Sequence, residues 1–285
     1  MIKFKNTEVV GWKHAIRGMR NPMNSWDKSD SGIKWFTHED VLKMDNDGVE
    51  FIPVSSDEYG QRVYMIGPND MKLIKNLVKS GPDHRKLLRH LDVYVDITAP
   101  LYWWKEFKTY RRDRKFMDEE NFYDYDIDDN SDDYDNEMFI EMNSCSTMHK
   151  IHSKEFTLDD FAHDHLISNA NDNPCDALFL NGTNIRVDSR NLLELTINVL
   201  NYYRNKYLET KDKKYWYQMI QLLPSSYMQK RTVKMSLEVV LRMYKSRYNH
   251  KLDEWKRHED GSYYGFCDWV HDLEYSNIII GEINE

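Results

Sequence analysis

The chain has little cysteine and no long apolar run. It has three cysteines among its 285 residues, at Cys145, Cys175 and Cys267. An odd number of widely spaced cysteines favours reduced thiols in the cytoplasm over a disulfide framework. No apolar run approaches the roughly 18–20 residues that span a membrane, and the N-terminal residues lack the apolar core of a secretory signal. We therefore expect a cytoplasmic protein that makes no membrane contact.

Basic residues are missing from one segment. Between Asp118 and Glu141 the sequence has twelve acidic residues and neither lysine nor arginine. The twelve negative charges of this segment exceed the net charge of −9 of the whole chain, so the remaining residues together carry a small positive charge. Such a body suits a small phosphate-bearing molecule, but its charge is too low to predict nucleic-acid binding. We expect an exposed acidic insertion at about residues 112–142, able to contact a basic partner.

A complete set of metal ligands is also missing. Asp124, Asp126 and Asp128 have the spacing that opens an EF-hand loop. The glycine position of that loop is Asp129, however, and its bidentate glutamate position is Asp135. There is no His-Glu-x-x-His run, and the histidines have no thiolate or carboxylate at a recognised ligand spacing. The sequence predicts no metal site.

The stretch from His90 to Arg111 combines the patterns of a strand and a helix. In its first half apolar residues alternate with polar ones, which predicts a strand with one buried face. Pro100 ends this strand and suits the first turn of the aromatic, basic helix that follows. The junction of a strand and a helix is a common place for a ligand. The predicted buried face consists of Leu91, Val93, Val95 and Ile97.

Weaker patterns predict the elements before this stretch. Residues 2–10 read as a strand and His14–Met19 as a short helix, and residues 48–66 read as a hairpin that turns near Gly60. A further helix begins with Asn69 or Asp70 as its cap and stops at Gly81. The run from Arg17 to Trp26, which begins in the short helix, places arginines, asparagines and a serine around a turn. Such a run suits phosphate or carboxylate recognition, or is a surface loop that caps its own backbone.

The C-terminal third has helical periodicity. One helix follows Ser189, a second spans Tyr215–Leu222, and the longest runs from Thr232 to about Arg257. The first would pack through Leu192, Leu195, Val199 and Tyr203, and the longest through Leu237, Val240, Leu241, Tyr244 and Tyr248. We expect an α+β fold, a small antiparallel sheet packed with helices, in a single domain that spans residues 1–285.

His90, Ala99-Pro100 and Arg111 have the spacing of a known motif. The sequence here resembles the flavin-dependent thymidylate synthases, in which a strand starts at a flavin-contacting histidine and passes through Ala-Pro. In that family the next helix ends in an Arg-His-Arg triplet. The first two triplet positions are Thr109 and Tyr110 in this chain.

Two later segments carry the same resemblance. Residues 143–149 resemble the family's Asn-Glu-x-Ser-x-Arg-Tyr loop and keep Asn143 and Ser146, with Ser144, Met148 and His149 at its Glu, Arg and Tyr positions. The run from Leu223 through Val233 resembles a family segment that opens a long helix ending in a substrate-binding arginine. That arginine would be Arg247, or its place would be taken by Lys245.

The resemblance implies a set of ligands and roles. FAD would contact His90, Thr109, Tyr110, Arg111 and Asn143. A pyrimidine deoxynucleotide such as dUMP would contact Glu106, Ser144, Cys145, Ser146, Thr147, Met148 and Arg247. Arg247 would also act in catalysis by orienting and polarising the base. NADPH and methylenetetrahydrofolate would be co-substrates of reductive methyl transfer, and the protein would be a homotetramer.

Replaced motif residues leave two alternatives open. Each lost charge-assisted hydrogen bond weakens ligand binding by roughly 1.5–3 kcal/mol, unless nearby arginines substitute. The leading interpretation is an active enzyme. The first alternative is a nucleotide-binding protein that has the fold without the redox chemistry. The second alternative is an interaction protein that uses its acidic segment.

Overall fold

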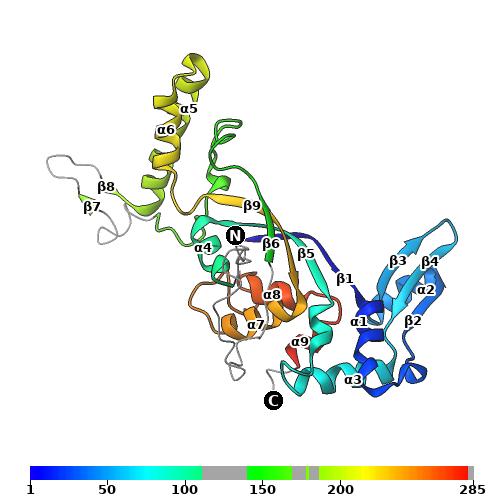
Figure 1. Cartoon of the computed structure of the whole chain (residues 1–285). Coiled ribbons are helices and arrows are strands. Elements are labelled where there is room, and N and C mark those ends of the chain that lie inside the picture. The colour runs from blue at the N-terminus through cyan, green and yellow to red at the C-terminus, as the bar shows by residue number, and fades with distance from the viewer. Residues whose placement is uncertain (111–139, 169–177, 180–185, 282–285) are drawn as a thin grey trace, which may run out of the picture. The chain divides into compact units, whose positions relative to one another are not determined.

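The computed structural model describes residues 1–110, 140–168, 178–179 and 186–281 (Figure 1). Arg111 and nearly all of the expected acidic insertion lie outside these residues. The chain divides into two units. Unit 1 consists of Met1–Lys5, Asp96–Thr109 and Met142–Thr232, and unit 2 consists of Asn6–Val95, Tyr110–Glu141 and Val233–Glu285.

A four-stranded sheet has the order β1-β5-β9-β6. Its strands are β1 (Lys3–Val10), β5 (Asp92–Pro100), β9 (Met228–Ser236) and β6 (Ile140–Ser144). Strand β5 confirms the predicted alternation, because Val93, Val95 and Ile97 are at most 1% exposed. Its polar neighbours Asp92 and Tyr94 are only partly covered.

Unit 2 has a three-stranded antiparallel sheet of order β2-β4-β3. The strands are β2 (Gly32–Thr37), β3 (Ile52–Ser56) and β4 (Gly60–Met65), with α2 (His38–Asn46) between the first two in sequence. The predicted hairpin is confirmed by the pairing of β3 with β4. Its turn forms because the Asp57 carboxylate accepts hydrogen bonds from the N–H groups of Tyr59 and Gly60.

Helix α3 (Pro68–Lys79) is capped differently from the prediction. Its N-cap is Gly67, rather than Asn69 or Asp70. The N–H groups of these two residues donate to the carboxylate of Asp30, at 2.9 and 3.1 Å. The orphan donors of the first turn are thus satisfied by a side chain from a distant segment, which no local pattern reveals. Unit 2 also includes α1 (Trp12–Met19) and the 3-10 turns η1 (Asn21–Met23), η2 (Trp26–Lys28) and η3 (Lys86–Arg89).

Helix α4 (Leu101–Phe107) follows β5 directly, with Pro100 as its N-cap. Trp103, Trp104 and Phe107 are buried, and their ring centroids lie 5.0–5.2 Å apart. The helix is shorter than predicted, because a 3-10 turn, η4 (Lys108–Tyr110), replaces its last turn.

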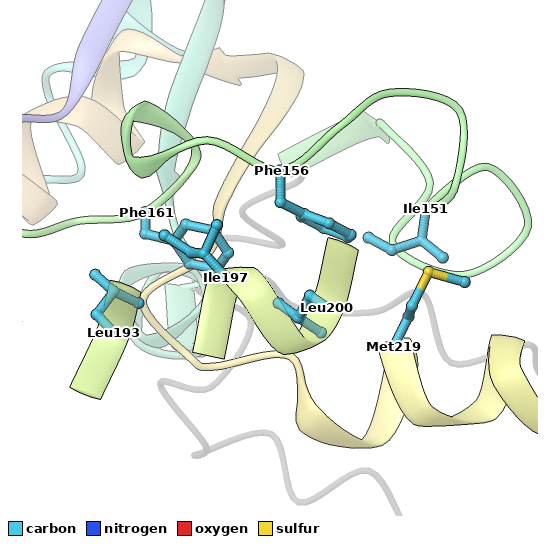
Figure 2. Packing of buried hydrophobic residues seen from close by; sticks show 7 residues of the cluster. All are labelled: Ile151, Phe156, Phe161, Leu193, Ile197, Leu200 and Met219. Carbon is cyan, nitrogen blue, oxygen red and sulfur yellow. The ribbon is translucent and has the colours of Figure 1, made fainter. Parts of the chain in front are cut away.

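The helical part of unit 1 packs around a cluster of seven buried side chains (Figure 2). Helices α5 (Ser189–Thr210) and α6 (Lys213–Leu222) contribute four of them. The predicted stripe on α5 is largely wrong, since Leu192 is 54% and Leu195 is 57% exposed, although Tyr203 does pack against the cluster. The cluster consists of Ile151, Phe156, Phe161, Leu193, Ile197, Leu200 and Met219.

The predicted helix from Thr232 to about Arg257 is wrong in its bounds. Residues up to Ser236 belong to strand β9, and helix α7 covers Leu237–Arg247 only. Burial along Met228–Ser236 alternates with a period of two, as in a strand that has one buried face. The helix begins after Ser236, whose hydroxyl caps it by accepting a hydrogen bond from the N–H of Val239. Of the predicted packing face, Leu237, Val240, Leu241 and Tyr244 are buried, whereas Tyr248 is only half-buried.

Short elements complete the described structure. They are η7 (Leu158–Asp160), the paired strands β7 (Leu178–Phe179) and β8 (Arg186–Val187), and helices α8 (Phe266–His271) and α9 (Asn277–Ile280). None of the helices in the described ranges combines the length and the apolar character needed to cross a bilayer. The fold is α+β, with small antiparallel sheets packed with helices, as predicted.

Candidate functional site

An arginine is buried in unit 1 between strand β9, helix α4 and strand β6. Arg231 is 7% exposed, and its Nε and Nη2 donate hydrogen bonds to Oε1 of Gln229 at 3.1 and 2.7 Å. Its Cζ lies 4.3 Å from the ring centroid of Trp104, and its Nη1 lies 3.9 Å from Sδ of Met142. Desolvation lowers the pKa of Arg231 below its ordinary value. Within the described part of the chain no carboxylate pairs with this guanidinium.

The sequence did not predict a role for Arg231. On β9 the residues Gln229, Arg231, Val233 and Met235 are all buried, so they form the inner face of a strand. The sequence hides that alternation, because Thr232 and the residues after it also fit the start of an amphipathic helix. A period of two from Gln229 to Met235, read without the helix assignment, is the signal that would have placed Arg231 on a buried face.

The predicted nucleotide loop is fastened to the same strand. The N–H of Cys145 donates to the carbonyl oxygen of Lys230 at 3.0 Å, and Nε2 of Gln229 donates to the carbonyl oxygen of Cys145 at 2.6 Å. Ser146 Oγ accepts a hydrogen bond from the N–H of Met148 at 3.3 Å. The structure therefore brings this loop to Gln229, which also holds Arg231. The exposed loop residues are Asn143, Ser144, Cys145, Ser146 and Met148, and Thr147 is half-buried.

Glu106 and Thr109 lie at the end of α4 and in the turn that follows it. Thr109 Oγ1 donates to the carbonyl oxygen of Glu106 at 2.7 Å, which closes the last turn. Two residues before Glu106 on the helix, Trp104 Nε1 donates to the carbonyl oxygen of Gln229 at 2.9 Å. Helix α4 is thus tied to β9 beside the buried arginine.

A second cluster in unit 2 joins two predicted site residues. The guanidinium of Arg247, in the last turn of α7, lies 5.1 Å from the ring centroid of Tyr110 and 5.2 Å from that of Trp255. The two ring centroids are 6.5 Å apart, so both rings lie next to the guanidinium, and cation–π attraction to each holds it in orientation. Lys245 is exposed on the same helix. Arg247 therefore lies against a predicted site residue, Tyr110.

His90 lies at the junction of η3 and β5 in unit 2. It is exposed, and its N–H donates to the carbonyl oxygen of Leu87 at 3.0 Å. Its own carbonyl oxygen lies so close to Gly11 that a Cβ there would be 2.2 Å away. The last predicted flavin contact, Arg111, lies outside the described residues. No group of three or more histidine, cysteine or acidic side chains in the described segments could hold a metal ion.

Comparisons with known proteins identify the fold. No protein-family model matches the chain, and no curated protein matches its sequence. Thymidylate synthase X from Helicobacter pylori, crystallised with FAD and dUMP, is similar over 100% of both chains, with a TM-score of 0.53 and 12% identity. This similarity shows that the chain has the fold of a flavin-dependent thymidylate synthase, which confirms the predicted fold.

Two further solved structures share 12% identity with the chain. A second structure of the Helicobacter pylori enzyme with FAD and dUMP covers 88% of this chain and 85% of its own, at a TM-score of 0.46. A UMP/dUMP methylase from Streptomyces cacaoi, bound with 5-Br UMP, covers 85% of each chain at 0.36.

Proposed function

We propose that this protein binds FAD and a pyrimidine deoxynucleotide such as dUMP and carries out reductive methyl transfer to the base, as a divergent flavin-dependent thymidylate synthase. The observation that carries this proposal is the buried Arg231 beside the loop at residues 143–148, in a chain with this fold. A desolvated guanidinium that no described carboxylate neutralises is a strong binder of an anion.

Arg231 supplies the positive charge that the nucleotide loop lacks. Met148 stands at the loop position where the family has an arginine, and a thioether cannot bind a phosphate through charge. The loop instead offers the hydroxyls of Ser144, Ser146 and Thr147, next to a strand that carries the guanidinium. We propose that these hydroxyls and Arg231 hold the phosphate of the nucleotide, with Gln229 orienting the guanidinium.

Arg247 is proposed to orient the pyrimidine base. Methyl transfer requires the base to become nucleophilic at carbon 5, so negative charge develops on its carbonyl oxygens. A cation fixed in advance stabilises that charge without reorganisation. The rings of Tyr110 and Trp255 provide this fixation for Arg247.

The described residues proposed to hold FAD are His90, Thr109, Tyr110 and Asn143, together with Arg111 outside the described part. His90 and Asn143 are exposed side chains that can donate hydrogen bonds, which fits a polar cofactor edge. When bound, FAD supplies the hydride that the protein itself cannot provide. NADPH and methylenetetrahydrofolate are the co-substrates that this reaction requires.

The proposed assembly is a homotetramer of one-domain chains. Strands β1, β5, β9 and β6 each run through both units, which supports a single domain. Helix α5 exposes Leu192, Leu195 and Tyr202 by 54–57%, at positions i, i+3 and i+10 of one face. Such an apolar stripe on a helix favours a contact with a second copy. Leu192→Glu together with Leu195→Glu should reduce the mass measured by light scattering.

Calorimetry with dUMP tests the proposed function. Arg231→Met should weaken dUMP binding about tenfold or more, the effect of losing one charged hydrogen bond. Lys230→Met is the matched control, because it removes the same charge from the neighbouring, exposed position of β9, where Lys230 pairs with Asp96. Equal affinities of the two variants would contradict the phosphate assignment.

A nucleotide-binding protein without redox chemistry is the second candidate. Thr109, Tyr110 and Met148, at three positions where the family has basic residues, favour it. Adding FAD to the purified protein separates the two functions, because FAD that binds the folded state raises the melting temperature by mass action. Binding of dUMP without binding of FAD would support the second candidate.

A further inference from the structure

A hollow in unit 2 lies among helix α1, turn η2 and strands β2 and β4, apart from the residues assigned above. Its volume is about 320 Å³, at the lower end of the range of small-molecule sites. Its floor includes Ile16 and Tyr64, which are 2% and 8% exposed. Arg17, Arg20 and Trp26, from the run that the sequence indicated, line it as well.

Two cations line this hollow without a carboxylate to neutralise them. Lys13 and Arg17 are four residues apart on α1 and therefore share a face. Neither forms an ion pair with any residue that the structure describes, and no aspartate or glutamate lines the hollow. Like charges at this spacing repel, and Lys13 lies in the first turn, where the helix dipole disfavours a cation. A bound anion would remove both penalties.

The third cation of the hollow is already neutralised. Arg20 is 4% exposed and forms an ion pair with the buried carboxylate of Asp70. The second oxygen of that carboxylate accepts hydrogen bonds from Ser29 Oγ and from the N–H of Ser31. This network fixes the position of the rim before any ligand arrives, so binding would require little ordering of the protein.

The lining of the hollow also offers an aromatic face. Trp26 is 52% exposed, although its Nε1 donates a hydrogen bond to Oδ1 of Asn21 at 2.8 Å. The indole is thus held in place while much of its surface is open. Ile33, which also lines the hollow, is 54% exposed. Apolar surface held open beside unpaired cations suits a ligand with a flat ring and a negative charge.

We propose that this hollow binds a small molecule that consists of one aromatic ring system and one phosphate group, of the size of a nucleoside monophosphate. Lys13 and Arg17 bind the phosphate, and Trp26 stacks on the ring. Phosphate is favoured over carboxylate because a phosphate monoester carries nearly two negative charges at neutral pH, which two cations balance. The proposal does not depend on the function proposed above, since none of these residues belongs to that site.

Calorimetry with AMP as the probe tests this proposal, with adenosine and inorganic phosphate as partial probes. Both partial probes should bind more weakly than AMP, because each lacks one half of the recognised chemistry. Arg17→Met should weaken AMP binding about tenfold, and Trp26→Ala should weaken it by a similar factor. Lys28→Met is the matched control, because it removes a charge from turn η2 at a residue that does not line the hollow.

Arg231→Met separates the two proposals. If AMP binds in the hollow, this variant retains AMP affinity even where it loses dUMP affinity. The proposal is overturned if AMP does not bind at millimolar concentration, or if Arg17→Met and Trp26→Ala leave its affinity unchanged. It is also overturned if inorganic phosphate binds as tightly as AMP, because the indole would then have no part in binding.

Discussion

Asp70 holds Arg20 in a buried ion pair, with Nε of Arg20 2.6 Å from Oδ1 of Asp70. Asp70 is 0% and Arg20 4% exposed, and the two residues are fifty positions apart in sequence. The same carboxylate accepts hydrogen bonds from Ser29 Oγ and from the N–H groups of Asp30 and Ser31. One side chain thus joins helix α3 to helix α1 and to the segment that precedes β2.

Loss of the Asp70 charge should destabilise the fold strongly. Asp70→Asn leaves the guanidinium of Arg20 buried without its counter-ion, and breaking one partner of a buried pair destabilises a protein by about 3–5 kcal/mol. Urea unfolding followed by circular dichroism measures this difference. The control Asp27→Asn changes an exposed carboxylate in the same region and should stay within about 0.5 kcal/mol of the parent. A similar loss in both variants would contradict this role of the ion pair.

The same carboxyl should make stability depend on pH in the acidic range. Burial alone would raise the pKa of Asp70, but hydrogen bonds from Ser31, Ser29 and Arg20 outweigh it and hold the pKa below its ordinary value. A carboxyl with a lowered folded-state pKa stabilises fully above its unfolded pKa, about 3.9, and this stabilisation is lost as the pH falls toward the folded-state pKa. The difference in melting temperature between the parent and Asp70→Asn should therefore shrink below about pH 4. A difference that grows on acidification would contradict the direction of the shift.

Gly11 should tolerate no side chain. Its φ is +101°, and a Cβ there would lie 2.2 Å from the carbonyl oxygen of His90. Gly11→Ala combines left-handed strain of about 1–2 kcal/mol with a backbone clash, so we expect a loss of about 3 kcal/mol or more in the free energy of unfolding. Gly18→Ala is the control within α1. A Cβ at Gly18 would meet no neighbouring atom within 4 Å, so alanine there should raise the free energy of unfolding by about 0.5–1 kcal/mol. FAD binding should weaken in Gly11→Ala if His90 contacts the cofactor.

Arg247 and Lys245 can be distinguished as nucleotide ligands. Arg247→Ala should weaken dUMP binding about tenfold, because it removes the cation held against Tyr110 and Trp255. Lys245→Ala removes an exposed charge two residues away and should leave the affinity unchanged. Calorimetry on both variants decides between them. The reverse result would assign the role to Lys245.

Local patterns were sufficient where one signal dominated. Strand β5 and the start of α4 were predicted because strict alternation ends at Pro100, which itself marks the helix start. The hairpin of β3 and β4 was predicted from its turn residues. By contrast, the segment from Thr232 to Ser236 also fitted the start of an amphipathic helix, and only the pairing of β9 with its neighbours makes it a strand. Pairing between distant segments has no local signal in one sequence.

The candidate sites were predicted only where motif residues remain. The loop at residues 143–148 and Arg247 were indicated by resemblance, and the structure places the former against β9 and the latter against Tyr110. Arg231 was missed because its position matches no motif. Its burial depends on Trp104 of α4, Met142 of β6 and Gln229 of β9. The partnership of Arg20 with Asp70 was missed for the same physical reason.

The corrected packing face of α5 gives a direct test of the fold. Leu200 is fully buried in the cluster of unit 1 (Figure 2). Leu195, on the same helix, is 57% exposed. Leu200→Ala should lower the free energy of unfolding by about 2–5 kcal/mol, because it removes apolar contacts and leaves a cavity. Leu195→Ala should change it by no more than about 0.5 kcal/mol in the monomer, since helix propensity is retained and little buried surface is lost. Chemical unfolding at low protein concentration measures both variants. If Leu195→Ala is the more damaging of the two, the helix packs through the stripe that the sequence favoured, and the face assigned by the structure is wrong.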